Sequence, residues 1–259
     1  MVRIYLTGEI CLESAGLLLR EQRLPGRQGR LAFAYLVCER RRAVPRDELA
    51  ELLWPQSLPA AWDVALSALV SKLRSLLTEL GLGREVIASA VGCYQVKLPA
   101  DVWIDTEAAL ASLHEAEGAL RAGMPERAYV PTVIAAAILR RPFLPGADGA
   151  WVDRQREALR AALLRTLDSR AELHTWNGEP SLALRAAEEA VRLEPYRETG
   201  YHRLLRMHLT RGNRAEALRV YERCRRLLAE DLGTRPTAET EAFLADVRAA
   251  RIHLSLDHR

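Results

Sequence analysis

A short motif occurs twice in the C-terminal half of this chain, at a spacing of 34 residues. GEPSLAL begins at Gly178 and GNRAEAL begins at Gly212, so a glycine precedes a stretch rich in Ala and Leu in both copies. A period of about 34 residues is typical of tetratricopeptide repeats, which are stacked helix–turn–helix units. We expect each glycine to end one helix just before the next begins. The repeat therefore predicts an array of packed helices, whose concave face commonly binds other proteins. The sequence AGMPERA at residues 122–128 is a candidate earlier turn of the same kind.

The composition fits a folded protein that works in the cytoplasm. With 259 residues, 49% hydrophobic and 27% charged, the chain is long enough for two domains and apolar enough to bury a core. No apolar run reaches the roughly eighteen residues of a membrane span, and residues 1–12 lack the pattern of a signal peptide. We therefore expect no membrane association. The four cysteines stand far apart, without CxxC spacing, so we expect reduced, mostly buried thiols, no metal site and no cofactor.

The N-terminal hundred residues have a mixed pattern of strands and helices. Residues 2–6 and 9–12 predict two short strands around a turn, and 17–20 predict a third. Helices are predicted over 28–41, 47–54 and 59–80, and two apolar stretches, 86–90 and 94–98, predict a β-hairpin.

The pattern predicts the domain organisation of the chain. We expect an α+β winged-helix domain over 1–98, a linker over 99–105, and an all-α tetratricopeptide-like helical domain over 106–259.

The third predicted helix carries the residues that indicate function. Its apolar positions form one stripe at helical spacing: Leu66, Leu69, Val70, Leu73, Leu77 and Leu80. A separate polar face carries small hydroxyls and cations, and no acid occurs between Asp63 and Glu79: Ser67, Ser71, Arg74 and Thr78, with Lys72 at its flank. Small side chains allow a helix to enter the major groove of DNA, and Arg and Lys can reach phosphates or guanine edges. The same face also fits an ordinary amphipathic helix that is only solvated.

Other residues near this helix are candidates for contacts with the DNA backbone. Thirteen Lys and Arg residues stand against ten Asp and Glu residues in the first 98 positions, whereas the remainder of the chain is neutral. Arg27 and Arg30 belong to a basic cluster around the first helix, and we consider them as phosphate contacts. Tyr94, in the predicted hairpin, either packs into the core or touches the backbone.

Several stretches together resemble the SARP group of actinobacterial regulators (Streptomyces antibiotic regulatory proteins). In the N-terminal part they are residues 24–31 (LPGRQGRL), 44–54 (VPRDELAELLW), 65–74 (ALSALVSKLR) and 91–96 (VGCYQV). In the C-terminal part they are residues 212–218 (GNRAEAL), 221–228 and 230–236 (EDLGTRP). Members of this group join an OmpR-type winged helix to a bacterial transcriptional activation domain of tetratricopeptide-like helices. The resemblance therefore implies a DNA-binding transcription regulator.

The resemblance also implies roles for individual residues. The family's Ser-Arg-Leu-Arg pattern falls on residues 71–74, so its DNA contacts carry over to Ser71, Lys72 and Arg74. Lys72 replaces the more common Arg, Leu69 stands where a His is often seen, and Asp63 stands where a polar or basic residue is frequent. The connection over residues 54–60 matches a loop that can face RNA polymerase, with Trp54, Gln56 and Ser57 as candidates. The same loop also fits a proline-stiffened turn with a buried tryptophan.

The implied partners are double-stranded DNA with promoter repeats and the RNA polymerase holoenzyme, and a homodimer is plausible. Some members of the group carry additional ATPase or forkhead-associated modules. Since the chain ends soon after the helical region, we expect no nucleotide or phosphopeptide site.

Two other classes of protein compete with a DNA-binding regulator. An enzyme is disfavoured because no nucleotide-binding, zinc-protease or serine-hydrolase motif occurs. A helical adaptor without DNA binding remains an alternative, as does a ligand sensor. In a sensor, four aromatic residues either line a pocket or belong to the core: Trp151, Trp176, Tyr196 and Tyr201.

Overall fold

The structure, a computed structural model, describes residues 1–245; the last part of the expected helical domain, 246–259, lies outside the described residues. The chain forms two compact units. The first consists of Met1–Ser112 and Ile134–Ala162, and the second consists of Leu113–Val133 and the chain from Leu163 onward. Each unit has its own core and is described by itself.

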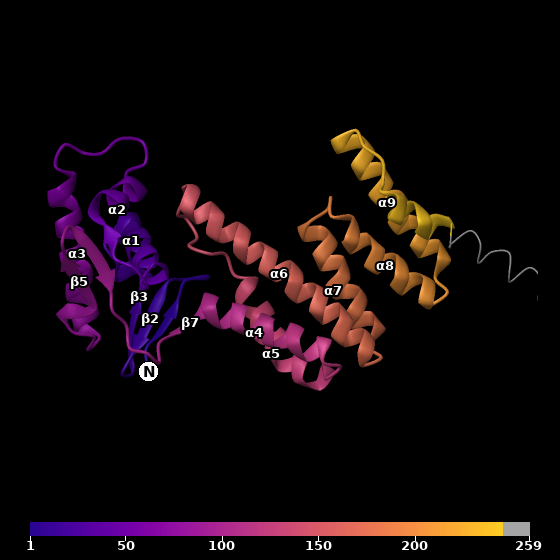
Figure 1. The fold of residues 1–259 in the computed structure, drawn as a ribbon, viewed down its shortest axis with the longest axis horizontal. Helices are drawn as coiled ribbons and strands as arrows, with labels where there is room; N and C mark the ends of the chain where they lie inside the picture. The colour runs from indigo at the N-terminus through magenta and orange to yellow at the C-terminus, as the bar shows by residue number, and fades with distance from the viewer. Residues whose placement is uncertain (246–259) are drawn as a thin grey trace, which may run out of the picture. The chain divides into compact units, whose positions relative to one another are not determined.

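A small sheet begins the first unit (Figure 1). Its strands are β1 (Arg3–Tyr5), β2 (Cys11–Ser14), β3 (Leu17–Arg20) and β7 (Trp103–Ile104), in the order β3-β2-β1-β7. β1 pairs antiparallel with β2 and parallel with β7. Ile4, Leu12 and Leu19 are buried on one side of the sheet, as the alternation of side chains along a strand requires.

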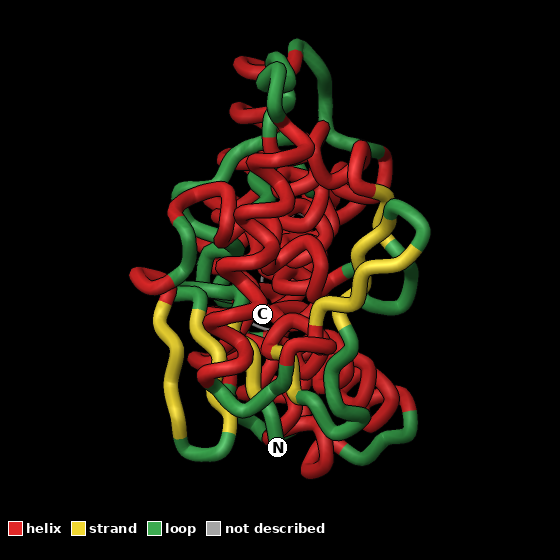
Figure 2. The backbone as a smooth tube through the Cα atoms, turned by 90° about the vertical axis from the view of Figure 1, so that its left-hand side faces the viewer, coloured by secondary structure: helices red, strands yellow, loops and turns green. Residues whose placement is uncertain are grey.

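Three helices follow the sheet in the first unit: α1 (Gly26–Cys38), α2 (Arg46–Leu53) and α3 (Trp62–Glu79). The 3₁₀ turn η1 (Glu21–Arg23) precedes them and η2 (Arg84–Val86) follows. Two antiparallel strands, β5 (Ile87–Ala90) and β6 (Cys93–Val96), form the hairpin that the sequence predicts. The short strand β4 (Val44–Pro45) joins its edge, and Figure 2 shows the strands as two separate groups. The order of strands, three helices and hairpin is therefore confirmed.

The segment expected as a linker, 99–105, is part of the first unit. Strand β7 lies within it, and Asp105 at the start of α4 is fully buried. The Asp105 carboxylate accepts hydrogen bonds from the backbone N–H groups of Leu6 and Thr7, both at 2.9 Å, and from the Thr7 hydroxyl at 2.7 Å. Because these partners lie about a hundred positions away in the sequence, local patterns give no sign of them. The first compact unit consequently extends past residue 98.

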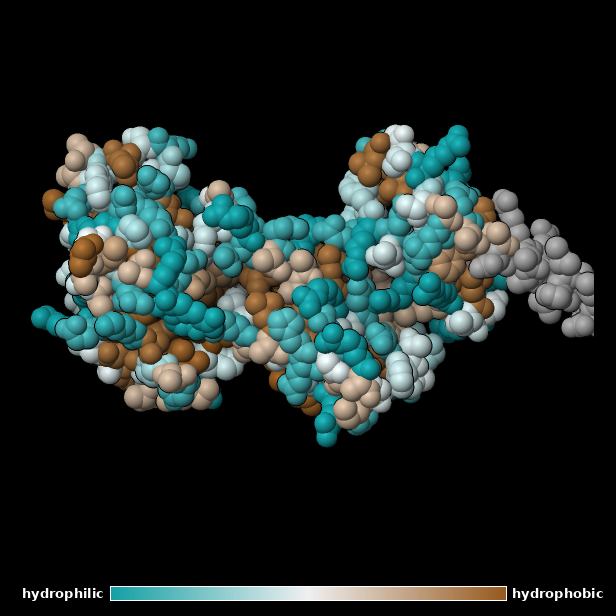
Figure 3. Space-filling view, viewed as in Figure 1, coloured by the Kyte–Doolittle hydropathy of each residue, from teal (hydrophilic) through white to brown (hydrophobic). Residues whose placement is uncertain are grey.

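The rest of the chain is helical. The helices are α4 (Asp105–Arg121), α5 (Pro125–Leu139), α6 (Ala150–Trp176), α7 (Pro180–Leu193), α8 (Glu198–Thr210) and α9 (Arg214–Leu232). α4, α5 and α6 each contribute residues to both units. In the second unit, Tyr201, Leu204 and Leu205 of α8 lie at the centre of a core that α7 and α9 complete. Hydrophilic side chains predominate on the face shown in Figure 3, with hydrophobic ones in small groups.

Three helix ends share one turn geometry. Gly178 and Gly212 both have φ +69°, and so does Gly123 between α4 and α5. At each turn the residue after the glycine donates its N–H to the carbonyl five positions earlier, at 2.8 or 2.9 Å. This is the Schellman arrangement, which satisfies carbonyl groups that the helix end leaves open. The two repeats are therefore confirmed as helix–glycine–helix units, and the candidate turn at 122–128 has the same form.

Gly200 of α8 allows a close approach to α7. A Cβ atom at this position would lie 2.9 Å from Cγ2 of Val191, a β-branched side chain with little rotamer freedom. We expect Gly200→Ala to destabilise the protein by about 1 kcal/mol, because overpacking outweighs the helix propensity of alanine. In a Val191→Ala background the same substitution should become neutral or stabilising. Urea unfolding of the four variants in this double-mutant cycle measures the effect, and an equal cost in both backgrounds would contradict the steric explanation.

Candidate nucleic-acid interface

Helix α3 separates its residues into a buried stripe and an exposed polar face. Leu66, Val70, Leu73 and Leu77 are buried, as predicted, and Leu69 is half-buried. The opposite face exposes four of the five predicted polar residues: Ser67, Ser71, Lys72 and Thr78. The geometry thus keeps a hydroxyl-and-cation surface open to solvent.

The exposed residues differ in how far they are already engaged. The Ser67 and Thr78 hydroxyls donate to helix carbonyls, those of Asp63 and Arg74, at 2.8 Å. Within the described residues, the Ser71 hydroxyl and the Lys72 ammonium group make no hydrogen bond or ion pair. Ser71 and Lys72 therefore have their full bonding capacity available for a ligand.

Arg74 connects α3 to the hairpin. Its Nε donates to the carbonyl of Ile87 at 2.8 Å, and its guanidinium carbon lies 5.9 Å from the centre of the Tyr94 ring. Arg74 also lines a polar hollow of about 420 Å³ together with Ser71 and Arg84. Arg84, which the sequence analysis did not single out, adds an exposed cation to this surface. Arg84 could have been found from the sequence, because it is a cation that lies just before the first strand of the predicted hairpin.

Tyr94 does not offer a surface for a direct contact. The residue is only 2% exposed, and its hydroxyl accepts a hydrogen bond from Nη1 of Arg46 at 2.5 Å. Its ring packs in the core, which is one of the two possibilities considered for Tyr94, and a contact with the DNA backbone stays an untested prediction. Its location on β6, opposite Val44 of β4, turns the side chain inward.

Arg46 is a second residue that the sequence analysis missed. From the first position of α2 its guanidinium reaches Tyr94, the Asp63 carboxylate, and the Ser67 hydroxyl at 2.8 Å. The side chain is 23% exposed. One cation thus joins α2, the first turn of α3 and the hairpin, and neutralises Asp63 beside the polar face.

The predicted phosphate contacts Arg27 and Arg30 lie in ion pairs. Arg27 pairs with Asp148 at 2.8 Å, and Arg30 lies 3.5 Å from Glu21. Arg27 lines a hollow of about 360 Å³ with Trp54, Gln56 and Ser57. The structure therefore groups Arg27 with the loop between α2 and α3, in which Gln56 and Ser57 are exposed and Trp54 is half-buried.

The aromatic residues considered for a ligand pocket are dispersed. Trp151 packs in the first unit, with its ring centre 5.0 Å from that of Tyr35, and Tyr201 belongs to the core of the second unit. Trp176 and Tyr196 are exposed. Within residues 1–245, no group of His, Cys, Asp and Glu is placed to hold a metal ion, and none of the described helices has the length and apolar character needed to cross a membrane.

Three features together are typical of a transcription regulator with a helical effector region. They are the polar surface of α3, the adjoining hairpin and the array of helices. The bacterial transcriptional activator domain family matches residues 104–248, more than half of the chain. The chain belongs to this family, and the resemblance to the SARP group is confirmed.

Similar proteins carry the name of transcriptional regulators. The transcriptional regulatory protein EmbR of Mycobacterium tuberculosis is 29% identical over 80% of this chain and 54% of its own length. The regulatory protein AfsR of Streptomyces coelicolor is 30% identical over 81% of the chain and 20% of its own length. The chain thus spans about half the length of EmbR and a fifth of AfsR.

A solved structure shares the fold. M. tuberculosis EmbR in complex with a low-affinity phosphopeptide superposes with a TM-score of 0.86 at 25% identity, over 96% of this chain and 65% of that one. The match supports a fold of small N-terminal sheets followed by a helical region.

Proposed function

We propose that this protein is a sequence-specific DNA-binding transcription activator that recruits RNA polymerase. The main support for this proposal is the exposed face of α3. On this face, Ser71 and Lys72 are exposed, and their side chains form no hydrogen bond or ion pair within the described part of the chain. In this proposal residues 1–98 act as an OmpR-type winged helix, with α3 in the major groove and the β5–β6 hairpin as the wing. Residues 99–105, which pack in the first compact unit, lead into an activation domain of tetratricopeptide-like helices over 106–259, and the family match at 104–248 supports a start near this position.

The proposed base and backbone contacts follow from the bonding state of each side chain. Ser71 and Lys72 are placed for bases or phosphates, and Arg74 and Arg84 contribute cations at the hollow beside the hairpin. The Thr78 hydroxyl donates its proton within the helix and keeps its oxygen free to accept, whereas the Ser67 oxygen already accepts from Arg46 at 2.8 Å. Arg27 and Arg30 can reach phosphates after exchanging their carboxylate partners.

The proposed polymerase contact is the loop with Trp54, Gln56 and Ser57. Its exposed amide and hydroxyl groups lie beside the Arg27–Asp148 ion pair. Promoter repeats would place two copies on neighbouring half-sites, so a homodimer on DNA is part of the proposal. Such a protein works in the cytoplasm at the nucleoid, and it performs no catalysis.

The test is a mobility-shift titration with the DNA upstream of the protein's own gene, followed by transcription in vitro with RNA polymerase. We expect a shift that weakens steeply as salt rises, because bound Lys and Arg release counterions from phosphates. We also expect more transcript from the shifted promoter. If no neighbouring promoter is shifted at low salt, the helical adaptor replaces the activator as the better explanation.

Arg46 provides a sharper prediction about the α3 surface. Arg46→Ala removes the cation that neutralises Asp63, so a carboxylate would face the phosphates. We expect DNA affinity to fall about tenfold, as for a lost charge pair of about 1.4 kcal/mol. The double variant Arg46→Ala/Asp63→Ala should recover part of the loss. Fluorescence anisotropy with labelled DNA measures both, and equal affinities of the single and double variants would refute the role of Asp63.

A further inference from the structure

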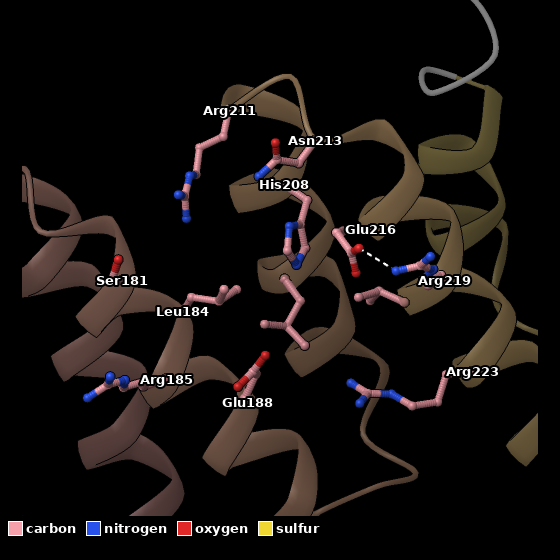
Figure 4. Close-up of a pocket in the computed structure, with 12 residues that line it drawn as sticks. Ser181, Leu184, Arg185, Glu188, His208, Arg211, Asn213, Glu216, Arg219 and Arg223 are labelled. Atoms are coloured by element: carbon pink, nitrogen blue, oxygen red, sulfur yellow. Dashed lines mark hydrogen bonds and ion pairs between the residues drawn. The ribbon is translucent and has the colours of Figure 1, made fainter.

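A groove in the second unit lies between α7, α8 and α9. It has a volume of about 660 Å³ and an apolar floor made by Leu184, Leu204 and Val220. Figure 4 shows His208 and Glu188 near the middle of the opening, with arginines around it: Arg185, Arg211 and Arg223. The groove is thus apolar at its base and cationic at its rim.

The arginines of the rim are only partly engaged within the unit: the guanidinium carbon of Arg223 lies 5.4 Å from the centre of the Tyr201 ring. Within the described residues no carboxylate forms an ion pair with Arg185, Arg211 or Arg223. A fourth arginine, Arg219, is already paired with Glu216 at 2.5 Å. The rim therefore keeps an excess of positive charge after its internal ion pair is counted.

His208 adds an unsatisfied group beneath this rim. The residue is only 7% exposed, and its Nδ1 has no hydrogen-bond partner within the described structure. Burial lowers the pKa of His208, although the nearby Glu216 raises it in part. A buried polar atom without a partner is costly, which is consistent with a site completed by a bound molecule.

The groove continues along α9 into a second hollow of about 540 Å³, which shares Arg219 and Arg223 and adds Arg226. The seven residue steps from Arg219 to Arg226 rise about 10 Å along the helix, the length of about three extended residues. An extended ligand can fill both hollows, whereas a compact molecule would occupy one. The apolar floor suits leucine-sized side chains, which a phosphate backbone does not offer, and the Glu188 carboxylate can accept peptide N–H groups.

We propose that this groove binds an extended acidic peptide segment of a partner protein, with leucine-sized side chains on the apolar floor and carboxylates on the arginine rim. The inference concerns the second unit and does not depend on the DNA-binding surface. It identifies a surface through which the helical region can hold a protein partner.

The test measures binding of a fluorescein-labelled peptide, DELEDLE, to the full chain by fluorescence anisotropy. We expect saturable binding that weakens as salt rises, and no binding of the uncharged peptide NQLQNLQ. Arg211→Glu and Arg223→Glu should each weaken binding about tenfold. Arg192→Glu, an exposed arginine of α7 outside the lining of the groove, is the matched control and should retain wild-type affinity. Melting curves verify that the variants are folded.

Four results would overturn the proposal. The first is equal affinity in the wild type and both groove variants, and the second is an equal loss in Arg192→Glu. The third is loss of peptide binding in Lys72→Ala, which would place the peptide on α3. The fourth is displacement of the peptide by random duplex DNA together with loss of that DNA in Arg223→Glu, which would make the groove a nucleic-acid site. If the protein fails to bind DNA, these measurements of peptide binding are unchanged. The peptide proposal and the DNA-binding proposal can therefore fail separately.

Discussion

Asp105→Ala should destabilise the first unit by about 3 to 5 kcal/mol, because hydrogen bonds to a charged group are stronger than average and their loss leaves buried donors unpaired. The carboxylate is fully buried and accepts from the N–H groups of Leu6, Thr7 and Thr106 and from the Thr7 hydroxyl, at 2.7 to 2.9 Å. Alanine can accept none of these bonds. The substitution would separate the N-terminal strands from the start of α4.

Guanidinium unfolding followed by tryptophan fluorescence measures this effect. Asp105→Asn keeps the shape and one acceptor oxygen, so we expect a smaller loss of about 2 kcal/mol. Asp101→Ala is the matched control, since its carboxylate is 68% exposed and lies 3.8 Å from the N-terminal amine. That variant should remain within about 0.5 kcal/mol of wild type. A change of similar size in Asp101→Ala and Asp105→Ala would show that burial and hydrogen bonding of Asp105 do not explain its role.

Lys72→Ala should weaken binding to promoter DNA about tenfold and reduce the slope of log affinity against log salt by about 1, because one phosphate contact is lost. The Lys72 side chain is exposed and makes no hydrogen bond or ion pair within residues 1–245, so we expect an unchanged melting temperature. Lys72 is therefore a cleaner probe than Arg74, whose Nε holds the carbonyl of Ile87. Arg74→Ala should reduce DNA binding and also loosen the hairpin.

The matched control for Lys72→Ala is Arg154→Ala, an exposed arginine on α6 in the same unit. We expect its DNA affinity and salt slope to equal those of the wild type. Affinity is measured by anisotropy at several salt concentrations with specific and random duplexes. An unchanged slope in Lys72→Ala would exclude the α3 face as the DNA contact.

The local elements of this protein follow from its amino-acid sequence alone. The apolar stripe from Leu66 to Leu77 and the glycine turns at Gly178 and Gly212 depend on residues within a few positions of one another. Such short-range relations can be recognised from the spacing of residues in the sequence. The exposed face of α3 followed from the same periodicity. Its most available residues, Ser71 and Lys72, were among those singled out.

Which polar side chains remain free depends on contacts between distant segments of the folded chain. Arg27 is paired with Asp148, 121 positions away, and the Tyr94 hydroxyl accepts a hydrogen bond from Arg46, 48 positions away. Asp105 was expected in a linker but belongs to the first compact unit, because its hydrogen-bond partners lie near the N-terminus. These outcomes depend on where the folded chain brings distant segments together, and no local pattern of charge or hydrophobicity encodes that path. The groove likewise exists only because α7, α9 and the turn after α8 bring their arginines around one apolar floor.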